Sequence, residues 1–167
     1  RLPAVGYDAQ EGYFAGIIPG TRKVVLGSTD GGGWREIGLA DADVVDVSNL
    51  QRQVLHGTST LGLPKLDSAR ARIHDLNPHV TLEAFPERLT AANALRIFEG
   101  FEVVLDGSDN FPTRYLINDV ALGLRIPVVH ASILGFEGQL TVFSARGAPC
   151  YRCLFAAPPP PELAPSC

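Results

Sequence analysis

Polar side chains gather at four places along the chain, and their types suit the binding of a nucleotide. Asp41 and Asp43 follow an apolar run, Lys65 stands at the start of a helical pattern, and residues 106–110 (Asp-Gly-Ser-Asp-Asn) follow a second apolar run. Residues 48–53 (Ser-Asn-Leu-Gln-Arg-Gln) begin with a serine of the kind that caps a helical turn. Carboxylates, amides and cations are the groups that hold phosphates and divalent metal ions.

Each residue type predicts a separate part of this chemistry. Asp41 is the candidate for a ribose, because a carboxylate just past the second strand accepts hydrogen bonds from both hydroxyls. Arg52 and Lys65 are candidates for offsetting triphosphate charge, one as a planar fork and the other as a point charge. Asp109 is the candidate Mg²⁺ ligand. Taken singly, the aspartates also suit turns or helix caps and the cations suit solvated surface, so their order along the chain carries the prediction.

Strands that alternate with helices must position these residues. The strand-like runs are 23–26, 37–40, 80–85, 103–105, 127–130 and 139–143. The helical patterns are 65–76, ended by Asn77-Pro78, then a segment capped by Thr90 and closed by Gly100, and then 112–124. This alternation predicts an α/β fold, a doubly wound and mostly parallel sheet with helices on both faces. Ligands of such sheets gather beyond the carboxyl ends of the strands, where three of the four polar groups fall.

The first strand-to-strand connection departs from this pattern. Only about ten residues, 27–36, separate the first two strands, whereas a parallel crossover normally takes a dozen or more. Asp30 would also place negative charge where phosphates are expected. We therefore expect an incomplete first βαβ unit, in which these residues turn back as a hairpin or the first strand leaves the sheet.

Composition and charge exclude several classes of partner. The chain has 167 residues, 46% of them hydrophobic and 19% charged, with a net charge of -4, which favours one domain over residues 1–167. Without a basic patch we expect neither nucleic acid nor an anionic membrane as a partner. Without a long apolar run or a signal-peptide pattern at the start, we expect a cytoplasmic protein. Residues 1–22 are interpreted as a surface lead-in or a broken short helix, and residues 154–167 as a Pro-rich tail.

The cysteines predict a metal or thiol role more than a disulfide framework. Cys150 and Cys153 form a C-x-x-C, which is half of a tetrahedral zinc site. The four histidines are dispersed and are interpreted as surface or core residues.

The order of the motifs identifies a resemblance to a known family. The matching segments are 41–43 with 48–53, Gly62-Leu63-Pro64-Lys65, Leu76-Asn77-Pro78, 106–110, Phe136-Glu137-Gly138-Gln139 and Cys150-Tyr151-Arg152-Cys153. Over residues 39–167 the chain resembles the ubiquitin-activating superfamily, within it the branch of ThiF, MoeB and HesA-like proteins. The resemblance implies a Rossmann-like fold and ATP-dependent adenylylation of the C-terminal glycine carboxylate of a small ubiquitin-like sulfur-carrier protein, carried out by a homodimer.

The resemblance also implies roles for particular residues. Asn49 joins Arg52 and Lys65 on the phosphates, Gln53 lies on the sugar side, and Asp109 holds Mg²⁺. Asp43 and Gly27 belong to segments that bind the nucleotide in relatives, although the glycines after Gly27 lack the spacing of the family's G-x-G-G-x-G loop. The family places a second cysteine pair well downstream, beyond this chain, so the zinc site formed by Cys150 and Cys153 is incomplete here. Cys167 aligns with a cysteine that some relatives use to take up the carrier, its alternative being an exposed terminal thiol.

Two other functions stay open at this point. One is a non-catalytic module that binds the carrier or forms the dimer, in a chain that is a fragment, a divergent gene product or a faulty reading frame. The weaker one is a dinucleotide-dependent oxidoreductase, for which the chain lacks the G-x-G-x-x-G spacing and a hydride-transfer site.

Overall fold

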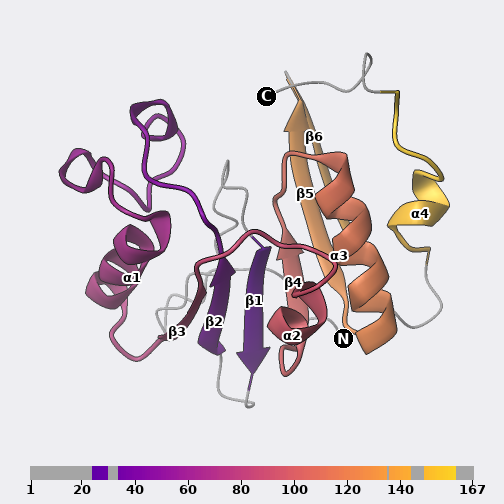
Figure 1. Ribbon diagram of the computed structural model, residues 1–167, viewed down its shortest axis with the longest axis horizontal. Coiled ribbons are helices and arrows are strands. Elements are labelled where there is room, and N and C mark those ends of the chain that lie inside the picture. Colours follow the sequence, from indigo (N-terminus) through magenta and orange to yellow (C-terminus); the bar gives the residue numbers. More distant parts are fainter. Residues whose placement is uncertain (1–23, 30–33, 135, 144–148, 161–167) are drawn as a thin grey trace.

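A single six-stranded sheet forms the centre of the computed structural model, which describes residues 24–29, 34–134, 136–143 and 149–160. The strands lie in the order β3-β2-β1-β4-β5-β6 (Figure 1). Their bounds are Val24–Thr29 for β1, Trp34–Ala40 for β2, Thr81–Phe85 for β3, Val103–Asp106 for β4, Val128–Leu134 for β5 and Glu137–Phe143 for β6. The helices are α1 (Lys65–Leu76), α2 (Ala94–Phe98), α3 (Phe111–Leu124) and α4 (Tyr151–Leu154), with short 3-10 turns η1 (Val47–Asn49) and η2 (Thr58–Thr60). The lead-in 1–22, Asp30 with its glycines, and Cys167 lie outside the described residues.

The first two strands form a hairpin. β1 pairs antiparallel with β2 on one side and with β4 on the other, whereas β2–β3 and β4–β5 are parallel pairs. β6 is antiparallel to β5, so β2, β3, β4 and β5 point one way and β1 and β6 the other. The α/β class and the Rossmann-like order are thus confirmed, and so is the expectation that the first βαβ unit is incomplete. Its physical reason is length, because a link of four residues between β1 and β2 allows a hairpin and no crossover.

Helices cover both faces of the sheet, as the alternation of side chains along the strands shows. In β2, Leu39 packs in a cluster with Leu66 and Ala69 of α1, while its neighbour Ala40 belongs to a cluster with α2 and α3. Successive residues of a strand point to opposite faces. α1 therefore covers one face, and α2 and α3 cover the other.

The cluster on the face covered by α2 and α3 is the larger one and forms the main core. Its fully buried members include Ile97 and Phe98 of α2, Val104 of β4 and Ile117 of α3, each 0% exposed. The helical patterns predicted from the sequence account for this core, because their apolar positions supply it.

The helix ends follow local sequence signals. α1 ends at Leu76 with Asn77 as its C-cap, as predicted. α3 begins after Asn110, whose side chain accepts a hydrogen bond from the Thr113 N–H. Its C-cap is Arg125, which has the left-handed conformation (φ 59°). α2 begins later than predicted, at Ala94, since the Thr90 carbonyl accepts the Asn93 and Ala94 N–H groups in a turn before the helix. None of the helices in the described ranges is long and apolar enough to cross a membrane.

Candidate functional site

The predicted site residues follow the carboxyl ends of β2 and β4, which lie at one edge of the sheet. β1 lies between these strands, and its first residue Val24 is in register with both Ala40 and Asp106. The segment after β2 carries Asp41, and the segment after β4 carries Asp109. Two stretches more than 60 residues apart in sequence are therefore brought to the same edge, separated there by one strand.

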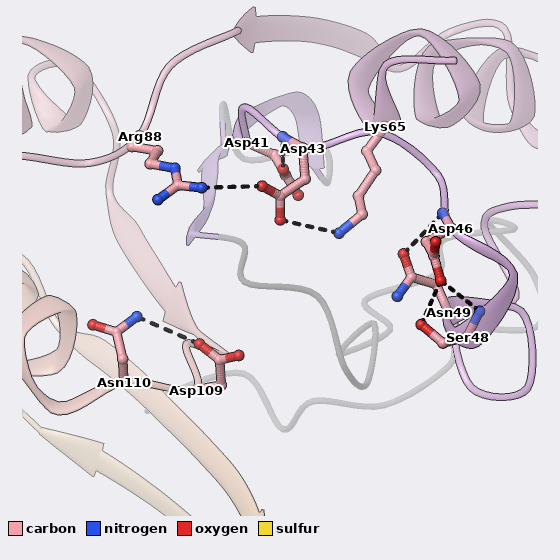
Figure 2. A network of polar contacts seen from close by, with 9 residues as sticks. All are labelled: Asp41, Asp43, Asp46, Ser48, Asn49, Lys65, Arg88, Asp109 and Asn110. Atoms are coloured by element: carbon pink, nitrogen blue, oxygen red, sulfur yellow. Dashed lines mark hydrogen bonds and ion pairs between the residues drawn. The ribbon is translucent and has the colours of Figure 1, made fainter. Parts of the chain in front are cut away.

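Asp43 pairs with two cations in this region (Figure 2). Its Oδ2 lies 3.4 Å from Lys65 Nζ, and its Oδ1 lies 3.7 Å from Arg88 Nη2. The Lys65 side chain is only 6% exposed, so the Asp43 carboxylate compensates a charge that burial would otherwise penalise. Asp41 is buried beside them, and its Oδ1 accepts the Asp43 N–H at 2.7 Å. This contact combines the turn role that the sequence left open with a place inside the candidate site.

The segment 46–53 is folded by its own side chains. Asp46 Oδ1 accepts the Ser48 N–H at 2.8 Å and the Ser48 hydroxyl at 2.6 Å, and these hydrogen bonds lower the pKa of Asp46. Asn49 Oδ1 accepts the Asp46 N–H in return, which completes a capping box around η1. Arg52 is exposed and donates to the Ser48 carbonyl at 2.8 Å, whereas Gln53 is 1% exposed. Capping thus orders the turn that carries Asn49 and Arg52.

Asp109 lies half-buried in the loop between β4 and α3. Its Oδ1 accepts a long hydrogen bond of 3.4 Å from Asn110 Nδ2. Ser108 is buried, and its carbonyl accepts both Nε and Nη2 of Arg114, at 3.2 and 2.9 Å. Asp109 is thus a carboxylate in a loop that hydrogen bonds keep in place just after a strand. Such a carboxylate fits Mg²⁺, which proteins bind through one or two carboxylates together with substrate phosphates.

The structure brings some predicted residues together and leaves others apart. Asp41, Asp43, Lys65 and Arg88 form one group in Figure 2, while Asp46 with Asn49 and Asp109 with Asn110 belong to separate elements around it. Gly27 is paired with Ile37 and Val103 within the sheet, away from the edge reached by Asp41 and Asp106.

A cavity of about 440 Å³ lies elsewhere, at α1 and the start of β3. It is lined by Asp67, Arg70, Ala71, Ile73, His74, Val80 and Leu82. None of the predicted site residues lines it.

The C-x-x-C segment is docked on α3. Tyr151 N–H donates to Asn118 Oδ1 at 2.8 Å, and the Arg152 guanidinium grips both carboxylate oxygens of Asp119 at 2.7 Å. The sulfur atoms of Cys150 and Cys153 lie 3.6 Å apart. Partial burial raises the pKa of the Cys150 thiol, but hydrogen bonds from Cys153, from the backbone and from Asn118 outweigh it and lower the pKa overall. Across the part of the chain that the structure describes, no group of three or more candidate metal ligands occurs.

Comparison with known proteins decides the family. The ThiF family model matches residues 25–167, which is most of the chain. This chain belongs to the ThiF family.

Curated relatives of this ThiF-family chain carry adenylyltransferase names. A "Sulfur carrier protein adenylyltransferase" of Thermus thermophilus is 44% identical over 176 residues, covering 99% of this chain and 65% of the Thermus protein. The "Adenylyltransferase and sulfurtransferase UBA4" of Saccharomyces cerevisiae is 50% identical over 138 residues, covering 82% of this chain and 31% of the yeast protein. The chain thus spans about a third of the yeast relative and just under two thirds of the Thermus one.

Solved structures share the fold of this ThiF-family chain. Escherichia coli MccB with ATP has a TM-score of 0.67 at 19% sequence identity, over 75% of this chain and 38% of MccB. PaaA has a TM-score of 0.61 at 25% identity, over 67% of this chain and 35% of PaaA. These likenesses show that the chain shares the fold of both solved structures over about two thirds to three quarters of its length.

Sequence reasoning missed two contributions to the site. Arg88, in the segment after β3, pairs with Asp43. The sequence offers one indication of this contact, which is that Arg88 lies just past the end of a predicted strand. Asp106 and His130 pair across β4 and β5, and a signal was present in the sequence, since each is the polar residue that follows three largely apolar ones in a predicted strand.

Proposed function

We propose that this ThiF-family chain binds Mg·ATP and adenylylates the C-terminal glycine carboxylate of a ubiquitin-like sulfur-carrier protein. In this step a carboxylate oxygen of the carrier bonds to the α-phosphorus of ATP, the bond from that phosphorus to the bridging oxygen breaks, and pyrophosphate leaves. The product is an acyl-adenylate, and no proton is transferred. The names of the Thermus and yeast relatives support this reaction class.

The observation that carries the proposal is the convergence of the segments after β2 and β4 at one edge of the sheet. Two anions must meet in this reaction, so fixed cations are needed where negative charge accumulates. Lys65 is held by Asp43 and is mostly buried, which fixes its charge in place before any substrate binds. Arg52 is exposed on an ordered turn and offers a planar fork to phosphate.

The remaining residues bind and orient the nucleotide. Asp41 would accept hydrogen bonds from the ribose hydroxyls, with Gln53 on the same sugar side. Asn49 would donate its amide to a phosphate oxygen. Asp109 would hold Mg²⁺, whose charge would neutralise the departing pyrophosphate.

Nucleotide binding and exchange test this proposal. Isothermal titration should show saturable Mg·ATP binding, and exchange of pyrophosphate into ATP should require the carrier. Asp109→Ala or Arg52→Ala should reduce that exchange by about a hundredfold to a thousandfold. Arg72→Ala is the matched control, because Arg72 pairs with Asp75 on the exposed side of α1. Unchanged exchange in both site variants would refute the assignment.

A non-catalytic, carrier-binding module is the second candidate. It is favoured by the hairpin, because β1 runs away from the site edge and Gly27 lies within the sheet. Carrier binding without Mg·ATP binding would support this candidate over the enzyme.

Four further properties belong to this proposal. A homodimer is proposed from the family resemblance, and a cytoplasmic location is proposed from the composition of the sequence. Cys167 is proposed as a site of carrier attachment. Cys150 and Cys153 are proposed as two zinc ligands, and the lowered pKa of Cys150 favours the thiolate that zinc requires. Such a zinc ion needs two more ligands from outside the described residues.

A further inference from the structure

A buried histidine and aspartate pair lies beneath the loop that carries Asp109. His130 Nδ1 lies 2.8 Å from Asp106 Oδ2, and both side chains are 2% exposed. The two residues are partners in the parallel register of β4 and β5. A buried carboxylate must be compensated, so a donor at this position is a structural requirement of the strand end.

Packing holds the imidazole ring in one orientation. Tyr151 meets it edge-on with 5.3 Å between ring centroids, and Phe143 lies 6.2 Å away on a tilted plane. A carboxylate accepts hydrogen bonds, so the ring donates through Nδ1–H. Since the aromatic neighbours restrict rotation, this hydrogen bond fixes Asp106 more firmly than a surface contact would.

Asp106 connects the His130 hydrogen bond to the loop that carries Asp109. Its other oxygen, Oδ1, accepts the Ser108 N–H at 2.9 Å. The carbonyl of Ser108 accepts two hydrogen bonds from Arg114, and the side chain of Asn110 caps α3. Asp109 therefore lies between Ser108 and Asn110, which hydrogen bonds keep in place. For Ser108, one of these bonds is to Asp106, which His130 contacts in turn.

We propose that His130 is a positioning residue, whose Nδ1–H holds Asp106 against the Ser108 N–H and so places the Asp109 carboxylate for a divalent cation. This inference rests on the proposed function, in which Asp109 holds Mg²⁺. His130 itself touches neither nucleotide nor metal ion in this scheme. Its substitution should weaken the metal-dependent part of nucleotide binding and leave the metal-independent part unchanged.

Two substitutions of nearly equal shape separate the hydrogen bond from packing. In His130→Asn the amide nitrogen replaces Nδ1 as a donor, whereas His130→Leu keeps a similar volume and donates nothing. Loss of a hydrogen bond to a charged group should speed amide hydrogen exchange at Ser108 about tenfold in His130→Leu, while His130→Asn stays close to the native rate.

Titration with Mn²⁺ and with nucleotide gives the second readout. With Mn²⁺ present, ATP should bind His130→Leu about tenfold more weakly than His130→Asn. With EDTA present, the two variants should bind ATP equally, which a general loss of structure would not allow.

Each outcome bears on the inference. Equal Ser108 exchange and equal Mn²⁺ dependence in the two variants would overturn it. If His130→Leu does not fold, His130→Gln takes its place, because the glutamine amide lies nearer to the position of Nε2. If the native chain binds no metal–nucleotide complex, the proposed function fails, and Ser108 exchange alone still decides whether His130 holds the loop.

Discussion

Strands β1 and β4 lie side by side in the sheet but end at opposite edges. β4 ends at Asp106 and leads into the loop that carries Asp109, at the same edge of the sheet as the segment after β2. β1 begins at that edge and runs away from it, which carries Gly27 into the sheet. The contrast shows that a motif after a strand can contribute to a site only when the carboxyl end of that strand lies at the edge of the sheet where the site is.

The two regions also differ in how they hold their residues. The β4–α3–β5 unit is a parallel crossover whose loop is tied by Asp106, Arg114 and Asn110. The β1–β2 unit is a hairpin, which needs four connecting residues and no helix. Only the first unit offers the start of a long helix beside the candidate metal ligand.

The largest expected effect tests whether strand direction governs function. Asp109→Ala should reduce carrier-dependent exchange by about a hundredfold to a thousandfold, roughly 3 to 4 kcal/mol of barrier. Gly27→Ala should change the exchange rate far less, because Gly27 lies within the sheet, away from the edge that carries Asp109. Exchange assays on both variants check this, and a large loss in Gly27→Ala would break the comparison between β1 and β4.

The second prediction compares the cores on the two faces. Ile117→Ala should lower the free energy of unfolding by about 3 to 4 kcal/mol, because Ile117 is 0% exposed inside the larger cluster. Leu66→Ala should cost about 2 to 3 kcal/mol, since Leu66 is 4% exposed and packs in the smaller cluster, where fewer buried side chains surround the space that it leaves. Urea denaturation measures both, and equal losses would contradict the difference between the faces.

The third prediction concerns the buried cation of the site. Lys65→Met should lower the free energy of unfolding by about 1 to 3 kcal/mol, because Asp43 loses one of its two partners and keeps Arg88. The double variant with Asp43→Asn should cost less than the sum of the single changes. Additive losses in urea denaturation would show that Lys65 and Asp43 do not interact.

The smallest effect concerns pH and the docking of α4 on α3. Hydrogen bonds from Arg152 lower the pKa of Asp119 in the folded chain despite partial burial. A lowered folded pKa stabilises the protein above the unfolded pKa, near pH 4, and this contribution disappears as the pH falls through the folded value. Asp119→Asn should therefore cost about 0.5 kcal/mol at pH 7, because both side chains are nearly half exposed, and less at about pH 2. Urea denaturation at the two pH values measures it, and an equal cost at both would contradict the assignment.

Most of the fold could be predicted from local patterns in the sequence. Helix α1 and its end at Asn77 follow from apolar spacing and a proline, and α3 follows from Pro112 and apolar spacing, whereas the asparagine cap of α3 was seen only in the structure. The direction of β1 was predictable only as an alternative, because linker length excludes a crossover without choosing between a hairpin and a lost strand.

Long-range contacts could not be predicted in the same way. The reach of Arg88 to Asp43 depends on how the loop after β3 folds back, which no local pattern encodes. The pairing of His130 with Asp106 depends on the register of two strands that are 24 residues apart in sequence. Candidate residues were therefore identifiable by type and order, but their supporting partners needed the three-dimensional arrangement.

The central position of β1 has a consequence for solubility. A sheet that lacked this strand would expose the backbone amides and carbonyls of β2 and β4 along two inner edges, and bare edges recruit strands from other molecules. In its antiparallel direction β1 pairs with both β2 and β4, so the outer strands of the sheet are β3 and β6. The hairpin thereby protects the protein against aggregation whether or not it catalyses a reaction.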